Sequence, residues 1–140
     1  MAGRHWRNWA EPLALLSVVL LIAVGLIHLL PVIGVLGGER LQALYGVTVE
    51  GPSLSILLRH RAVLFALIGG VMVAGALYRP WRLLALGMGL VSVVSFLMLA
   101  HVEGGGSSAV QKVVRVDVAA LLALLVVAII EARAHLLPPG

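Results

Sequence analysis

Four long apolar stretches divide the chain, at residues 12–36, 54–78, 81–102 and 113–134. Each is long enough for a helix that crosses a hydrocarbon core of about 30 Å, which takes roughly 20 residues. No stretch alternates apolar and polar residues with the period of two that a barrel strand requires. Helices satisfy their own backbone hydrogen bonds in lipid. The pattern therefore predicts an all-α integral membrane protein, a single four-helix bundle over residues 1–140.

The composition excludes several other classes of protein. Hydrophobic residues make up 61% of the chain and charged residues only 11%, whereas soluble domains average about 25% charged residues. Lys and Arg outnumber Asp and Glu by 10 to 6, but they form no basic stripe of the kind that follows a nucleic-acid backbone. The absence of cysteine rules out disulfides and thiolate chemistry. The expected partner is the lipid bilayer, and no nucleic acid is expected.

The basic residues also predict an orientation in the membrane. Arg4 and Arg7 precede the first apolar stretch, and a short turn carries Arg79 and Arg82 beside aromatic residues. Positive charge favours the cytoplasmic side, so we expect a multi-pass membrane protein with both termini in the cytoplasm. The first stretch is too long for a signal peptide and is expected to remain as a helix that begins at Pro12.

Polar residues are distributed unevenly between the two ends of this bundle. The cytoplasmic ones are expected to be surface anchors, with Glu131 and His135 forming an ordinary surface pair. In the last stretch the uninterrupted apolar run, residues 118–130, would be only about 20 Å long, so Asp117 and Arg115 should lie at or below the outer interface. Their candidate partners come from other helices: Arg61, His60, His101 and Glu103.

The segments between the stretches predict further detail. Residues 39–45 predict a short interfacial helix that Gly46 ends, and residues 104–108 predict a flexible connector. Pro31 is expected to kink the first helix. Small residues recur at helical spacing and predict close packing, extended by self-association into a homo-oligomer: Ser17, Gly25, Ala62, Ala66, Gly70, Ala74, Ala85, Gly89 and Ser92.

Several strings in the chain resemble one family of proteins. They are residues 25–31 (GLIHLLP), 39–41 (ERL), 44–46 (LYG), 59–65 (RHRAVLF), 89–96 (GLVSVVSF) and 115–117 (RVD). The pattern resembles small four-helix bacterial inner-membrane proteins of unknown function, DoxX-like in layout. Members are often labelled phosphopantetheine adenylyltransferase, a soluble enzyme with a Gly-His-type motif that is missing here, so we treat that label as a naming error. The resemblance implies a fold and a set of polar strings, but no activity.

The concentration of opposite charge and histidine at the outer end motivates a functional hypothesis. We expect a non-enzymatic bundle that binds a small amphipathic or anionic ligand there, as a carrier, sensor or accessory subunit, with no catalytic residue and no cofactor. The candidate ligand-binding residues are His28, Arg59, His60, Arg61, Arg115 and Asp117, with Glu39, Arg40 and Tyr45 as a rim and His101 and Glu103 nearby.

Three alternatives remain open at this point. The outer charges could form a structural ion-pair network instead of a pocket. The chain could be a membrane enzyme that acts on lipid or isoprenoid material, with His60 as base and Asp117 as its orienting partner. It could also be a redox subunit that holds haem or a metal through His28, His60 and His101.

Overall fold

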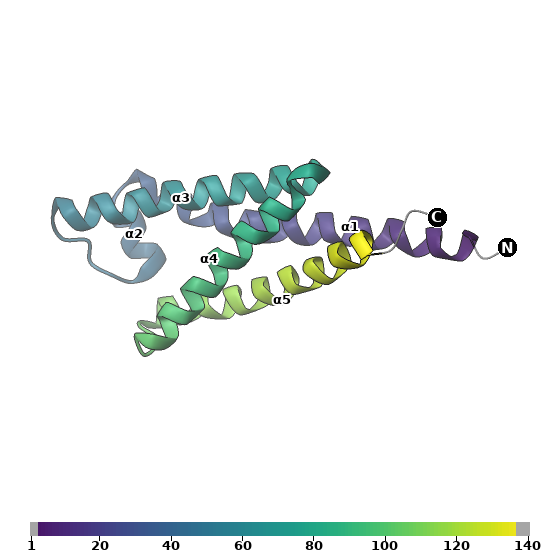
Figure 1. Cartoon of the computed structure of the whole chain (residues 1–140). Coiled ribbons are helices and arrows are strands. Elements are labelled where there is room, and N and C mark those ends of the chain that lie inside the picture. Colours follow the sequence, from purple (N-terminus) through teal and green to yellow (C-terminus); the bar gives the residue numbers. More distant parts are fainter. Residues whose placement is uncertain (1–2, 137–140) are drawn as a thin grey trace.

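The chain folds into helices throughout the part that the structure, a computed structural model, describes: the backbone of residues 3–136 and side chains from residue 11. No strand occurs in residues 3–136, which confirms the predicted all-α bundle (Figure 1). The elements are α1 (Gly3–Leu29), η1 (Leu30–Leu36), α2 (Gly38–Tyr45), α3 (Gly51–Leu77), η2 (Arg79–Trp81), α4 (Arg82–Val102) and α5 (Ser108–Leu136).

The four long helices pack as a ring. α1 contacts α3 and α5, and α4 contacts the same two helices from the opposite side. In Figure 1, α1 and α3 run side by side, whereas α4 leaves α3 at η2 and crosses to the start of α5. We name the two ends of the bundle after the short elements there: the η2 end, where α3 meets α4, and the α2 end, where α3 begins and α4 meets α5.

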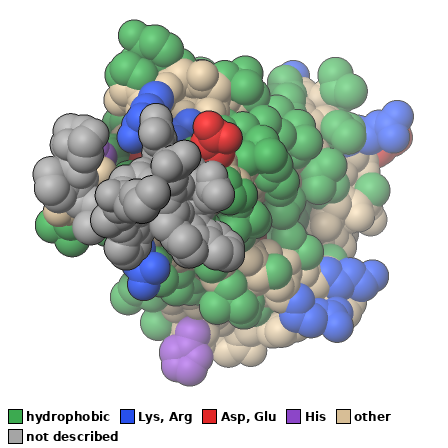
Figure 2. All heavy atoms as spheres, turned by 90° about the vertical axis from the view of Figure 1, so that its right-hand side faces the viewer, with side chains coloured by type: hydrophobic (Ala, Val, Ile, Leu, Met, Phe, Trp, Pro, Cys, Tyr) green, Lys and Arg blue, Asp and Glu red, His purple; other side chains and the backbone are tan. Residues whose placement is uncertain are grey.

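All four long helices are apolar and long enough to cross a membrane, as expected of a multi-pass membrane protein. Large hydrophobic side chains stand exposed on each of them, for example Leu15, Leu67, Val91 and Leu122. Figure 2 looks onto the η2 end, where Lys and Arg side chains lie around the margin and hydrophobic side chains cover much of the remaining surface. Exposed apolar area on this scale needs lipid or another apolar partner around it.

The first helix differs from its predicted boundaries. α1 begins at Gly3, so Pro12 lies inside the helix and does not start it. A proline removes one intrahelical hydrogen bond, and here that loss does not end the helix. At Pro31 the predicted disruption occurs: the α-helix ends at Leu29 and the chain continues as the 3₁₀-helix η1.

Small residues set the distance between the helices. A methyl group added to Gly69 would lie 2.7 Å from the Gly25 carbonyl oxygen, so α1 and α3 touch backbone to backbone there. The predicted stripe on α3 is wrong at Gly70, which is exposed and faces open space, because its neighbour Gly69 is the residue turned toward α1. The predicted face on α4 is confirmed, since Ala85 and Gly89 are buried.

The α2 end is held together by short contacts. α2 forms as predicted and ends at Gly46, which adopts the left-handed conformation with φ 64°. Its Leu41 is fully buried and packs against Gly34 of η1. The expected flexible connector is instead anchored: the Ser107 hydroxyl donates to the Tyr45 carbonyl oxygen (3.2 Å) and accepts from the Val110 N–H at the start of α5 (3.3 Å).

Candidate ligand-binding site

A cavity of about 200 Å³ opens at the α2 end, and every helix of the bundle contributes to its wall. Most of the lining is apolar, from residues such as Ile27, Leu44 and Val116. The polar side chains that reach it are His28 of α1, Tyr45 of α2, Arg61 of α3, and Lys112 and Asp117 of α5. The cavity thus combines apolar walls with a few convergent polar groups, which is the usual composition of a small-molecule site.

His28 is held in one orientation by two hydrogen bonds. Its Nδ1 lies 2.9 Å from the Val24 carbonyl oxygen, and its Nε2 lies 3.1 Å from the Ser92 hydroxyl of α4. A carbonyl oxygen can only accept, so Nδ1 carries the proton, and in the neutral imidazole Nε2 accepts from Ser92. His28 therefore joins α1 to α4 at the floor of the cavity.

Arg61 is surrounded by aromatic rings. Its guanidinium carbon lies 5.0 Å from the ring centroids of Tyr45 and of Phe65, and 5.8 Å from that of Phe96. Within residues 11–136 no carboxylate comes within ion-pair distance of Arg61, and none of the side-chain hydrogen bonds involves it. Ring faces stabilise the cation without occupying its N–H groups, so the guanidinium keeps its donors available.

The charges of Arg61 and Asp117 act on the pKa of Tyr45 in opposite directions. Burial raises the pKa of the Tyr45 phenol above its ordinary value of 10.0; the positive charge of Arg61 lowers it, and the negative charge of Asp117 raises it again. The phenol is therefore protonated at neutral pH and can donate a hydrogen bond into the cavity.

A larger groove lies beside the cavity, on the surface of the bundle between α3 and α4. It has a volume of about 1100 Å³ and shares Arg61, Phe65 and Phe96 with the cavity. Most of its other lining residues are apolar and follow α4 from Leu83 to Ala100. Leu64 and Ile68 of α3 and Val110 of α5 also line it. The Glu103 carboxylate lies at its α2 end.

The structure brings together only some of the residues that the sequence singles out. His28, Tyr45, Arg61 and Asp117 line the cavity, and Glu103 lines the groove. The others are exposed and do not line the cavity: Glu39, Arg40, Arg59, His60, His101 and Arg115. Of these, Arg59 has a structural contact, because its Nε donates to the Val35 carbonyl oxygen of η1 at 2.9 Å.

Sequence reasoning identified Tyr45 but missed the other two aromatic residues, Phe65 and Phe96, and also Lys112. Phe65 lies four residues after Arg61, on the same helix face, and that spacing could have identified it as a neighbour of the guanidinium. Phe96 comes from another helix, and no pattern in the sequence pairs it with Arg61.

The histidines do not gather into a metal site. No group of three or more potential ligands from His, Asp and Glu occurs among the described residues. Both ring nitrogens of His28 are engaged, while His60 and His101 are exposed. His60, the base of the enzyme alternative, does not line the cavity with Asp117, its expected orienting partner; the histidine that contacts a hydroxyl group there is His28, with Ser92.

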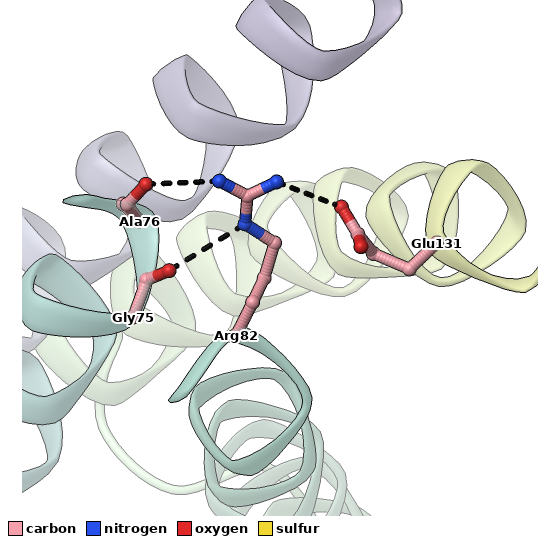
Figure 3. Close-up of polar contacts among 4 residues, drawn as sticks. All are labelled: Gly75, Ala76, Arg82 and Glu131. Atoms are coloured by element: carbon pink, nitrogen blue, oxygen red, sulfur yellow. Dashed lines mark hydrogen bonds and ion pairs between the residues drawn. The ribbon is translucent and has the colours of Figure 1, made fainter. Parts of the chain in front are cut away.

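The η2 end contains a buried ion pair that overturns the expectation of surface anchors. Arg82 donates through Nη1 to Glu131 Oε1 at 3.2 Å, through Nη2 to the Ala76 carbonyl oxygen at 3.1 Å, and through Nε to that of Gly75 at 3.5 Å (Figure 3). The two charged side chains are only 9% and 6% exposed. Glu131 therefore pairs with Arg82 of α4 inside the bundle, and the predicted surface pair with His135 is wrong.

Comparison with known proteins adds nothing to this geometry, since no protein-family model, curated protein or solved structure matches the chain. The resemblance to DoxX-like membrane proteins stays a prediction.

Proposed function

We propose that the protein binds a small amphipathic ligand with an anionic head group in the cavity at the α2 end, as a carrier, sensor or accessory subunit of a bacterial inner membrane. The observation that supports this most is Arg61, a cation in an apolar wall whose neighbours are ring faces and whose N–H donors have no protein acceptor among the described residues.

The balance of charge in the cavity supports an anionic head group. Arg61 and Lys112 contribute two positive charges and Asp117 one negative charge. Guanidinium groups bind phosphates and carboxylates with strong, charge-assisted hydrogen bonds. Tyr45 adds a neutral donor, and the Asp117 carboxylate can accept a hydrogen bond from a hydroxyl group of the ligand.

The depth of Arg61 suits a molecule that is partly embedded in the bilayer. The apolar part of α3 that follows it, residues 62–77, is about 24 Å long, somewhat shorter than a hydrocarbon core of about 30 Å. Arg61 therefore lies near one edge of the core, at the depth where an amphipathic molecule changes from apolar to polar. With both termini in the cytoplasm, this edge is the outer one.

The test uses octyl phosphate, a short amphiphile with an anionic head, added to the purified protein in a neutral detergent. A hydrogen bond to a charged group contributes about 1.5–3 kcal/mol, so Arg61→Gln should weaken binding about ten- to a hundredfold. Arg115→Gln removes the same charge from the same end but from an exposed position outside the cavity, and it should leave binding unchanged. Equal binding by wild type and Arg61→Gln would overturn the proposal.

A further inference from the structure

The groove between α3 and α4 has the shape of a site for a long, apolar molecule. Its lining follows α4 from Leu83 to Ala100, a distance of about 25 Å at 1.5 Å per residue. Toward the η2 end its walls come from Leu83, Leu84, Gly87 and Met88, with no charged group. Charge appears only toward the α2 end, where Arg61 and Glu103 lie.

The cavity and the groove complement each other in size. Drug-sized ligands occupy pockets of about 300–1,000 Å³, so the cavity of about 200 Å³ has room for a head group but not for a whole phospholipid. The groove of about 1100 Å³ is large enough for the remainder. Arg61, Phe65 and Phe96 belong to both, so a molecule with its head in the cavity and its chains in the groove would cross at the guanidinium.

From these observations we propose that the ligand is an anionic phospholipid with a hydroxylated head group, which enters sideways from the bilayer between α3 and α4. Its chains lie in the groove, its phosphate contacts Arg61 and Lys112, and its head-group hydroxyls face Asp117 and Tyr45. This inference rests on the proposed function and names the class of ligand and its route.

The charges in the site are complementary to this lipid. A phosphate diester brings one negative charge to a cavity whose side chains sum to one positive charge. The hydroxyl groups of a glycerol head can both donate and accept, which matches a carboxylate acceptor beside a phenol donor. A choline head offers no hydroxyl donor and carries a positive charge into a cavity whose charged side chains, Arg61, Lys112 and Asp117, already sum to one positive charge.

Gly87 allows the groove to be blocked without disturbing the bundle. It lines the groove, is exposed, and a methyl group built on it meets no atom within 4 Å. Gly70 of α3 is also exposed and equally open, but it does not line the groove. Gly87→Phe and Gly70→Phe are therefore a matched pair that adds the same ring inside and outside the proposed site.

The experiment measures lipid binding by native mass spectrometry of the purified protein with equal amounts of phosphatidylglycerol and phosphatidylcholine. We expect wild type and Gly70→Phe to bind phosphatidylglycerol preferentially. Gly87→Phe should lose binding of both lipids about tenfold, and Gly87→Leu should lose less. Arg61→Gln should still bind both lipids through their chains but should lose the preference for phosphatidylglycerol.

The possible failures separate the two proposals. If Gly87→Phe and Gly87→Leu bind lipid as wild type does, the groove is not the chain site, and the proposed function still stands on the octyl phosphate result. If Arg61→Gln keeps the preference for phosphatidylglycerol, the head group is not at Arg61, and this inference fails. Equal binding of both lipids by wild type would mean that the protein binds the surrounding lipid without selection, and it would also overturn the inference. Size-exclusion profiles and helical content of each variant verify that it is folded.

Discussion

Two arginines in the same apolar bundle have opposite surroundings. Arg82 at the η2 end is buried and donates to the Glu131 carboxylate and to the carbonyl oxygens of Gly75 and Ala76. Arg61 near the α2 end lies among three aromatic rings without a carboxylate partner in the described part of the chain.

The difference separates a structural cation from one that can receive a ligand. All the contacts of Arg82 are internal and join α3, α4 and α5, so it fixes how these helices meet. The ring faces around Arg61 stabilise its charge but use none of its five N–H groups. In an apolar bundle, the partners of a charge therefore indicate its role better than its depth does.

The largest expected effect comes from breaking the buried pair. Removing one partner of a buried ion pair leaves an unpaired charge and costs about 3–5 kcal/mol, so Glu131→Leu should lower the free energy of unfolding by about that amount. Unfolding by a denaturing detergent, followed by circular dichroism, measures it. The double variant Arg82→Met with Glu131→Leu should recover most of the loss, because no unpaired charge remains. If Glu131→Leu alone were as stable as wild type, the structural role of the Arg82–Glu131 pair would be contradicted.

A smaller effect on stability is expected at Arg61. Its loss removes cation–π contacts worth about 0.5–1 kcal/mol each where they are partly exposed, and Met at this position refills part of the volume among the rings. Arg61→Met should therefore lower the free energy of unfolding by about 1 kcal/mol in the same assay. A loss as large as that of Glu131→Leu would mean that Arg61 is a structural cation as well.

The smallest effect is electrostatic and concerns Tyr45. Because burial raises its pKa, the phenol should ionise above pH 10.0, and stability that depends on the neutral phenol should be lost as the pH rises through its folded pKa. Arg61 lowers this pKa, so Arg61→Gln should shift the midpoint upward. The absorbance of phenolate, taken as the difference between each protein and its Tyr45→Phe form, gives the midpoint. An unchanged midpoint would mean that Arg61 lies too far from the phenol to affect its pKa.

Much of the fold could be predicted from the sequence because hydrophobic length determines which segments span. The four long helices and α2 follow from apolar runs and glycine positions. The ends of the helices were harder to predict: α5 begins at Ser108 and not at residue 113. Polar residues can continue a helix beyond its apolar part, and the hydropathy pattern does not reveal this.

The site could be predicted only in part, because a sequence gives depth but not the rotation of each helix about its axis. His28, Tyr45, Arg61 and Asp117 share the cavity, whereas His60, next to Arg61 in the chain, points to the exposed surface. The Arg82–Glu131 pair joins residues 49 positions apart, and both looked like interfacial charges because each lies near the end of an apolar stretch.

The double hydrogen bond of Ser107 has a consequence for how a ligand is exchanged. It ties α2 to the start of α5, and α2 contributes Leu44 and Tyr45 to the cavity wall. Under the proposed lipid route, with α2 fixed across one side of the cavity, exchange would take place within the plane of the membrane, between α3 and α4. Occupancy would then follow the mole fraction of the ligand among the surrounding lipids and would not respond to its concentration in water.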